Sequence, residues 1–371
     1  MNITDPIILV AGSARMLALA AKKSGLRPLV IDLYSDIDTQ QVAEAVYRVP
    51  SLAIEHLAPA VDYFVEFYAA TTIIYGSGFE YYPESLVFLE SRLKIVGNDS
   101  AVFSKLLDKQ AFFKQLQRLG ISFPEVSFSA PDQEENWLRK PMRGFGGLGI
   151  QYYRKNHVDH SACYWQKYQP GRSHSVLFLA NGNTLQLIAF NTQWTVKLNE
   201  KEEFGFSGII NYAELQTGQK IRLVDWLGQL VRWYQLKGLN SLDFIQQGDQ
   251  TYILEINPRP SASMALFEDD LLSAHSKACQ GLLGSYLAVQ VGYTGYQIVY
   301  ASQELVIPDY FEWPEGCGDL PLPGVIIGTG QPICSMIAHQ KQAQAVLKQL
   351  SNTQNIITNK LERFQDHAIY R

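Results

Sequence analysis

The sequence predicts a mixed α/β and α+β fold in three parts: a Rossmann-like domain at residues 1–98, a strand-rich central domain at 99–294 and a small α+β domain at 295–371. The first part alternates apolar strands with helices, which is typical of a doubly wound parallel sheet. The second part begins with a helix of 3.6-residue periodicity and is then dominated by strands. The third part combines strands with two clusters of Pro and Gly and a closing helix. A chain of 371 residues is long enough to build two or three cores.

The composition predicts a folded, cytoplasmic protein. Hydrophobic residues make up 47% of the chain and charged residues 18%, with no low-complexity segment, which excludes a disordered tail. The net charge of −5 and the absence of a Lys/Arg cluster argue against a nucleic-acid partner. The first apolar run is too short for a signal peptide or a membrane span. Widely separated cysteines argue against a zinc site or a disulfide framework; they are Cys163, Cys279, Cys317 and Cys334.

The first element is an apolar strand, followed by a small-residue turn, a helix and a second strand that ends at Asp32. This order predicts a βαβ unit of the Rossmann-like kind. Asp32 stands about where a dinucleotide-binding domain places its ribose-binding acid, but the first turn offers only Gly12. A scaffold role is therefore favoured, with an NAD site as the alternative.

The next apolar strand, Thr72–Tyr75, is followed by a second small-residue turn of Gly76, Ser77 and Gly78. In open α/β sheets such strand ends face the ligand crevice. These three residues are therefore candidates for contact with a small substrate, and tight packing of the turn explains them equally well.

Three longer helices are predicted in the remaining chain. The first covers 98–120 and ends at Gly120, before a turn at Pro124. A second runs from about 220 to 236, and a third follows the last central strand, from roughly 265 to 290. Strands fill most of the sequence between the first two helices.

The stretch from Trp137 to Tyr153 contains Gly144, Gly146 and Gly149 at the G-x-G-x-x-G spacing. A dinucleotide site needs a strand before such glycines and a helix after them. Here the residues after Gly149 are β-prone, so the local prediction is two strands joined by a mobile glycine-rich turn. Its bare backbone amides could cover phosphates, and a plain glycine hairpin is the alternative.

The most specific pattern lies in a predicted hairpin with its turn at 248–249. Glu255 and Asn257 share one face of the returning strand, and hairpin pairing brings Asp243 beside them. Two carboxylates and an amide oxygen are donors suited to Mg²⁺. Arg259 continues the same series, with a guanidinium that could grip phosphate or carboxylate. The alternative interpretation of an isolated E-x-N pattern is that its polar side chains simply face solvent on one side of the strand.

Together these motifs resemble those of the ATP-grasp superfamily, in its carboxylate-amine ligase and biotin-carboxylase-like group. The E-x-N-P-R-P run at 255–260 is similar to that family's metal-binding strand, and the glycine stretch to its phosphate-covering loop. Lys140 and Lys109 stand where the family places lysines that reach the nucleotide phosphates, and "YWQKYQPG" at 164–171 resembles its adenine hinge. The resemblance covers roughly residues 99–290 and implies an ATP-grasp fold there, preceded by a pre-ATP-grasp domain.

This resemblance implies ATP and Mg²⁺ as cofactors and assigns residues to each. The expected metal ligands are Asp243, Glu255 and Asn257. The residues expected around ATP are Lys109, Lys140, Gly144, Gly146, Gly147, Gln166, Lys167, Tyr168 and Gln169. Arg259 and Lys140 are expected to act catalytically, Arg259 on the transferring group. Gln166 and Ser173 depart from the family, which often has glutamates there for the adenine amino group and the ribose.

The activity implied is that of an ATP-dependent ligase, which joins a small carboxylic acid to an amine through an acyl phosphate, in amino-acid or one-carbon coenzyme biosynthesis. The expected partners are a small carboxylate and an amine, with neither nucleic acid nor membrane, and a homodimer is compatible with this function. Three alternatives stay open: a kinase that stops at a phosphorylated product, a biotin-carboxylase-like carboxylation, and a dinucleotide-dependent oxidoreductase.

Overall fold

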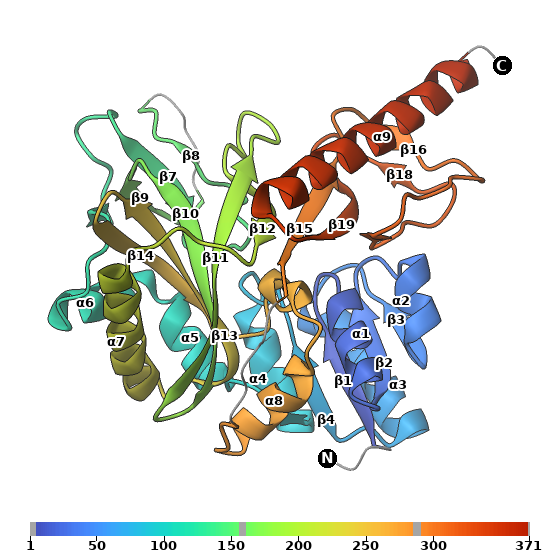
Figure 1. The fold of residues 1–371 in the computed structure, drawn as a ribbon. Coiled ribbons are helices and arrows are strands. Elements are labelled where there is room, and N and C mark those ends of the chain that lie inside the picture. Colours follow the sequence, from blue (N-terminus) through green and yellow to red (C-terminus); the bar gives the residue numbers. More distant parts are fainter. Residues whose placement is uncertain (1–4, 156–160, 285–290, 370–371) are drawn as a thin grey trace.

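The computed structural model describes residues 5–155, 161–284 and 291–369 (Figure 1). A parallel sheet at the N-terminus stands beside a large antiparallel sheet, and a smaller four-stranded sheet projects from the central region. None of the helices in the described ranges combines the length and the apolar character that crossing a membrane requires.

The N-terminal region is a five-stranded parallel sheet, which confirms the predicted Rossmann-like unit. Its strands, in sheet order, are β3 (Ala45–Arg48), β2 (Arg27–Asp32), β1 (Pro6–Val10), β4 (Thr72–Tyr75) and β5 (Lys94–Ile95). Its helices are α1 (Arg15–Lys23), α2 (Ile37–Val42), α3 (Ile54–Tyr68) and α4 (Pro83–Arg92). Chain order reverses between β1 and β4, so the carboxyl ends of these two strands mark the crevice where such sheets bind ligands.

The predicted single helix over 98–120 is two helices, α5 (Ser100–Leu107) and α6 (Lys109–Arg118). Asp108 causes the break, because its side chain accepts a hydrogen bond of 2.9 Å from the backbone amide of Ala111 and so begins a new helix. The second helix starts with Lys109, and this placement directs that lysine toward the central sheet.

The glycine-rich stretch joins two strands, as the sequence predicts. These strands belong to a four-stranded sheet in the order β6 (Val126–Ser127), β9 (Cys163–Lys167), β7 (Trp137–Pro141) and β8 (Gln151–Tyr152). The glycines connect β7 to β8, which pair in antiparallel fashion. No helix follows the last glycine, so the local structure differs from that of a dinucleotide fingerprint.

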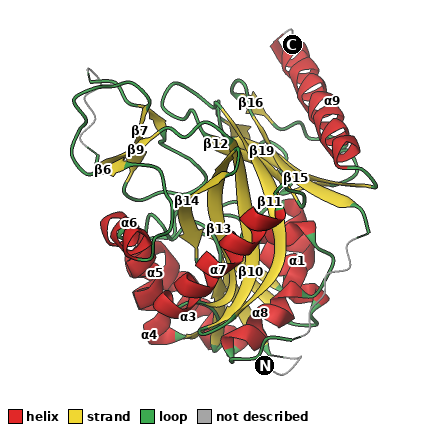
Figure 2. Cartoon of the chain, turned by 60° about the vertical axis from the view of Figure 1, so that its left-hand side comes forward, coloured by secondary structure: helices red, strands yellow, loops and turns green. Residues whose placement is uncertain are grey.

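The large sheet has eight strands and carries the core of the central region. In sheet order they are β14 (Gln250–Asn257), β13 (Lys237–Gln247), β10 (Arg172–Asn181), β11 (Leu185–Val196), β12 (Gly205–Ile210), β15 (Tyr293–Tyr300), β19 (Pro332–Gln340) and β17 (Cys317–Gly318). Alternate residues of β10 face opposite sides. Val176 and Phe178 pack with α7 (Thr217–Tyr234), whereas Leu177 and Leu179 pack with α8 (Leu271–Cys279) and the N-terminal region (Figure 2).

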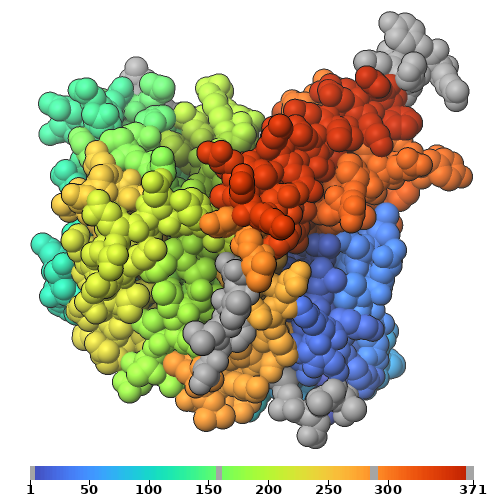
Figure 3. Space-filling view, viewed as in Figure 1, coloured from blue at the N-terminus to red at the C-terminus, as the bar shows by residue number. Residues whose placement is uncertain are grey.

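The C-terminal region continues this sheet instead of building a separate one, because β15 pairs with β12. Helix α9 (Ala343–Ile369) packs on β15 and β19, and the short strands β16 (Leu305–Val306) and β18 (Ile326–Ile327) form a small ribbon. Figure 3 shows this region, in orange and red, lying across the junction between the other two. The α+β character is confirmed, while the boundaries at 98 and 294 stay predictions.

The predicted helix over 265–290 is wrong. A 3₁₀ turn, η1 (Ala262–Leu266), is followed by the short α8, and residues 285–290 lie outside the described part. Asp270 caps α8 through a 3.0 Å hydrogen bond from the amide of Ser273. Gly281, with a φ of 92°, follows the end of α8, in a conformation that other residues rarely adopt.

Candidate active site

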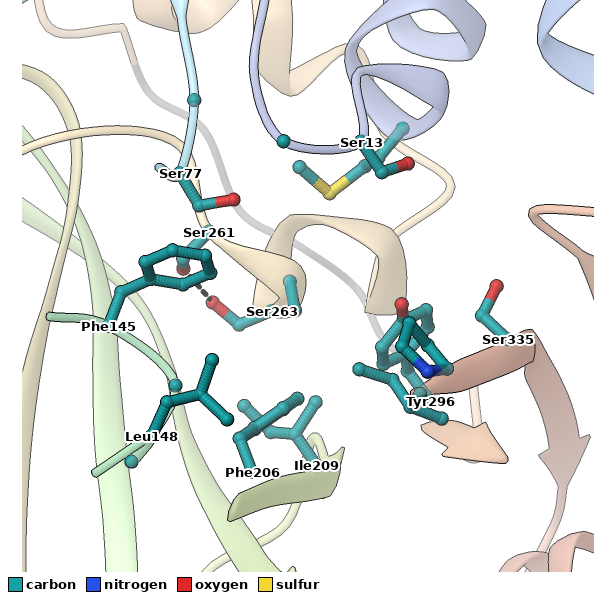
Figure 4. A pocket seen from close by; sticks show the side chains of 18 of the residues that line it. Ser13, Ser77, Phe145, Leu148, Phe206, Ile209, Ser261, Ser263, Tyr296 and Ser335 are labelled. Carbon is teal, nitrogen blue, oxygen red and sulfur yellow. Dashed lines mark hydrogen bonds between the residues drawn. The ribbon is translucent and has the colours of Figure 1, made fainter. Parts of the chain in front are cut away.

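A large cavity of about 1410 Å³ lies where the three regions meet. Figure 4 shows Phe145 and Leu148 of the glycine loop on one side, Tyr296 and Ser335 on the opposite side, and Ser13 and Ser77 above. The predicted site residues that line it are Gly76, Ser77, Lys140, Gly146, Gly147, Gln166, Lys167, Tyr168, Gln169, Asp243, Glu255, Asn257 and Arg259. Most of the predicted site is therefore gathered around one space.

The candidate metal ligands lie on the predicted hairpin, β13–β14, where a bulge between Asp243 and Phe244 shifts the register that the two-residue turn sets. Asp243 is directly opposite Glu255, and the Asn257 amide donates a 3.0 Å hydrogen bond to the Asp243 carboxylate. Gln193 on β11, which the sequence analysis missed, donates a further bond of 3.1 Å to Asp243. These contacts hold both carboxylates at the cavity wall.

The electrostatics of this pair fit a divalent cation. Burial, followed by repulsion from Glu255, raises the pKa of Asp243 to about 7. Burial also opposes the ionisation of Glu255, but Lys109 and Lys140 lower its pKa below the usual range. Within the described ranges no three or more His, Cys, Asp and Glu side chains gather as a metal site, so Asn257 and outside ligands would complete the shell.

Lys140 is a buried cation on β7, directed at the cavity. Its Nζ donates a 3.1 Å hydrogen bond to the side-chain oxygen of Gln166 and lies 5.8 Å from the centre of the Tyr164 ring. Burial lowers the pKa of Lys140 to about 8. The Gln166 side-chain nitrogen is buried and has no partner among the described residues. An anion with acceptor oxygens would satisfy both groups, which fits the phosphates of ATP.

Lys109 lies beside the large cavity instead of in its lining. Its Nζ forms a 3.0 Å ion pair with Glu255, and both residues line a small adjacent cavity together with Gly144. Lys109 therefore reaches the candidate metal site through its ion pair with Glu255, from the small cavity. Gly144 belongs to the same small cavity, so neither residue touches the main space as the sequence analysis expected.

The glycine loop is docked against the segment 203–206. The amide of Phe206 donates a 2.7 Å hydrogen bond to the carbonyl of Gly146, and a Cβ on Gly147 would overlap the Phe204 carbonyl oxygen. Gly146 and Gly147 have φ values of 64° and 74°, in the left-handed region that favours glycine. This close approach places the loop backbone over the part of the cavity that contains Lys140.

A pair of alanine variants separates backbone strain from docking. Gly147→Ala should lower ATP-dependent turnover by about tenfold or more, because the added Cβ forces the loop to move away from the backbone of Phe204. Gly146→Ala introduces similar strain, but its Cβ would meet no heavy atom within 4 Å, so its effect should be smaller. Steady-state kinetics with a fixed acid substrate measures both. Equal losses in the two variants would contradict a role for docking.

The hinge from Gln166 to Gln169 lines the cavity, but part of its backbone is already engaged. The amide of Lys167 donates to the carbonyl of Glu125 at 2.8 Å, and that of Tyr168 to Asn136 at 2.7 Å. These two amides cannot also serve adenine. Base recognition through this segment would have to use its other polar atoms.

Arg259 is buried and held by an acid that the sequence analysis missed. Its Nε and Nη2 donate to one oxygen of Glu80 at 2.7 and 2.6 Å, and Nη2 also reaches the Asn257 oxygen at 3.3 Å. Glu80 follows the turn after β4, and its other oxygen accepts from the amide of Gly78 at 2.8 Å. The only sequence signal for this contact was an acid shortly after a small-residue turn.

The turn after β4 lies partly in the cavity wall. Gly76 and Ser77 line the cavity, and the Ser77 carbonyl accepts a 2.8 Å hydrogen bond from Gly12 at the end of β1. Gly78 is a correction, because it is buried outside the cavity lining and packs against Leu52. Its amide donates the 2.8 Å hydrogen bond to Glu80.

Comparison with known proteins agrees with this geometry. Residues 106–263 match the sequence profile of an ATP-grasp domain. The biotin carboxylase domain of Hydrogenobacter thermophilus 2-oxoglutarate carboxylase, a dimer crystallised with MgADP, ADP and bicarbonate, superposes with a TM-score of 0.71 at 14% identity over 94% of this chain and 89% of that one. The L-amino acid ligase of Bacillus licheniformis gives a TM-score of 0.72 at 12% identity over 95% and 97%.

A curated relative of this chain is an uncharacterized protein of Methanocaldococcus jannaschii. It is 24% identical over 262 residues, which are 66% of this chain and 64% of the relative. The match therefore spans less than two thirds of that relative's own length.

The profile match and the fold therefore define the central region of the protein as an ATP-grasp domain. Residues 106–263 match an ATP-grasp domain, and the fold of the chain is that of biotin carboxylase and L-amino acid ligase. The predicted resemblance and fold class are confirmed.

Proposed function

We propose that this protein is an ATP-dependent ligase, which activates a small carboxylic acid as an acyl phosphate and joins it to an amine. The observation that carries the proposal is the gathering of four groups around one cavity. These are the facing carboxylates of Asp243 and Glu255, the buried Lys140, and Arg259 held by Glu80. Phosphoryl transfer depends mostly on positioning and charge neutralisation, and this set supplies both.

Each group has a distinct role in the proposal. Asp243, Glu255 and Asn257 would hold Mg²⁺, which neutralises charge on the nucleotide phosphates. Lys140 would contact the phosphates from the floor of the glycine loop. Arg259 would face the transferring group, where charge develops, because the Glu80 contact fixes the direction of its guanidinium.

The size of the cavity supports more than one bound substrate. Pockets for a single small ligand usually measure roughly 300–1,000 Å³, and this cavity exceeds that range at about 1410 Å³. The space beyond the glycine loop is lined by the N-terminal and C-terminal regions, so an acid and an amine could lie there beside ATP. A cytoplasmic location and a homodimer remain predictions.

Hydroxylamine trapping tests the proposal. The protein would be incubated with Mg-ATP, hydroxylamine and a panel of small carboxylic acids. Formation of a hydroxamate, with release of ADP and phosphate, is the result expected of a ligase. Accumulation of a phosphorylated acid in the presence of amines would identify a kinase instead. A strict need for bicarbonate with no hydroxamate would favour the carboxylation reaction.

Lys140→Ala should weaken ATP binding by about 10- to 100-fold without unfolding the protein, since a charge-assisted contact is lost while a buried cation is removed. Its pKa of about 8 predicts proton uptake when ATP binds near that pH, because a bound anion restores the charged amine. Calorimetry in two buffers of different ionisation heat measures both effects. The exposed Lys114→Ala on α6 is the control, and unchanged ATP affinity in Lys140→Ala would contradict the phosphate role.

A further inference from the structure

The end of the cavity formed by the N-terminal and C-terminal regions contains a buried carboxylate without a partner. Asp36, between β2 and α2, is 6% exposed and lines the cavity. Its carboxylate forms no hydrogen bond or ion pair with any residue in the described ranges. A buried carboxylate of this kind is costly unless a ligand completes it.

The neighbouring acids differ from Asp36, because each of them has partners. Asp38 accepts from the amides of Asp319 and Leu320, both at 3.0 Å, and forms an ion pair with Arg15. Asp319 accepts from Ser13 at 2.6 Å and from Ser335, and lies 4.0 Å from Arg15. These contacts leave Asp36 as the carboxylate available to a ligand.

Asp32 is also occupied, by the amides of Ser35 at 2.8 Å and Ala14 at 3.4 Å. Arg48 lines the cavity as well, but it is exposed and its Nε donates to the carbonyl of Leu33 at 3.1 Å. Asp32 and Arg48 therefore form hydrogen bonds with backbone atoms and not with the carboxylate of Asp36.

The charge environment of Asp36 favours a cation. Burial, followed by repulsion from Asp319, Asp32 and Asp38, raises its pKa to about 8, and Arg15 only partly opposes this. The carboxyl is therefore mostly protonated at neutral pH in the free protein. A positive group placed beside it would restore its charge and remove the cost of burying it unpaired.

The surrounding wall is suited to an organic cation. Tyr34, Tyr296 and Tyr300 line the same part of the cavity, and burial raises the pKa of each, so their rings stay neutral. Figure 4 places Tyr296 and Ser335 together on this side. Aromatic faces attract ammonium groups, whereas a metal ion needs several oxygen ligands, and in the described part of the chain the acids around Asp36 do not form a group of three or more that could hold a metal ion.

We propose that Asp36 binds the protonated amino group of an organic amine, and that this end of the cavity is the binding site of the amine substrate. The assignment of the amine as a substrate rests on the proposed ligase function. The binding site itself rests on the position, burial and missing partner of Asp36.

Matched ligands test the charge requirement without any turnover. Benzylamine and benzyl alcohol have similar shapes, but only the amine is positively charged. At a pH just above the pKa of Asp36, calorimetry should show that the ammonium form binds at least about tenfold more tightly than the alcohol. Asp36→Asn should abolish this preference. Asp269→Asn, an exposed carboxylate at the same cavity, should retain it.

The thermal stability of the variant gives an independent readout. In the free protein Asp36 keeps its proton up to about pH 8, whereas the unfolded chain loses it near pH 4, so the wild type loses stability between these values. Asp36→Asn lacks this loss. Its melting temperature should therefore rise relative to wild type as pH increases from about 4 to 8.

Two binding results would each overturn the site: equal binding of amine and alcohol to the wild type, or an ammonium preference that survives Asp36→Asn. A lower melting temperature for Asp36→Asn throughout this pH range would also overturn it, since the residue would then be a structural partner. ATP titration separates the two proposals. If ATP fails to bind while the ammonium preference holds, the ligase function is wrong and the amine site is supported.

Discussion

We expect Glu255→Gln to lower ATP-dependent turnover by about 10³-fold, because it removes a carboxylate charge from the proposed metal site. The side chain keeps its shape, so the hairpin register opposite Asp243 should be unchanged. Hydroxamate formation at saturating acid, measured across a range of Mg²⁺ concentrations, reports the effect. Full activity at ordinary Mg²⁺ would remove the metal assignment.

The same variant also leaves Lys109 without its ion-pair partner, so stability must be measured beside activity. Urea unfolding should show a modest loss, since the Glu255 side chain is 32% exposed and its pair is partly screened. Glu214→Gln is a matched control, because it also removes one charge from an ion pair, in this case an exposed one with Arg172. Its turnover should equal that of the wild type.

The second large effect is expected for Arg259→Lys, which should slow hydroxamate formation by about 10²-fold with little change in ATP affinity. The guanidinium uses Nε and Nη2 to hold Glu80, and its Nη1 donates to the carbonyl of Pro260 at 3.4 Å, so the direction of the group is fixed. A lysine keeps the positive charge but has a single donor group, so it cannot hold Glu80 and the transferring group together.

The rival explanation is that Arg259 only stabilises the fold through Glu80. The ion pair is deeply buried, with side-chain exposures of 6% and 7%, so breaking it costs about 3–5 kcal/mol. Glu80→Gln breaks the pair and leaves Arg259 in place, and comparison of the two variants by urea unfolding separates the roles. A loss of turnover in Arg259→Lys that matches its loss of stability, or a silent variant, would contradict the catalytic assignment.

Local patterns explain which parts of the site could be predicted from the sequence. The two-residue turn and the period of a strand place Asp243 and Glu255 on one hairpin, but a bulge between Asp243 and Phe244, which no sequence pattern signals, sets the two residues directly opposite each other. The first βαβ unit follows from short apolar runs. By contrast, Glu80 is 179 residues away from Arg259, and no local pattern pairs them. The hydrogen bond from Gln193 to Asp243 depends on how β11 lies beside β10 in the sheet.

Helix boundaries failed where a capping side chain outweighed the apolar period. Asp108 and Asp270 each accept a backbone amide three residues on, and each starts a new helix inside a segment that reads as continuous. Asp36 could not be predicted as a site residue from the sequence, for a different reason. An acid in a polar loop is ordinary in a sequence, and only burial without a partner makes it a candidate site.

The hydrogen bond from Ser13 to Asp319 joins positions 306 residues apart, and Asp38 meets Asp319 across 281. Closing loops of this length costs entropy before any contact repays it. We therefore expect the wall around Asp36 to be the last part of the protein to form during folding. The residues proposed to bind the nucleotide, between β7 and β14, come from a shorter continuous stretch and can assemble earlier. We therefore expect a folding intermediate that binds ATP before it can bind an amine. Pulsed hydrogen exchange during refolding would detect it.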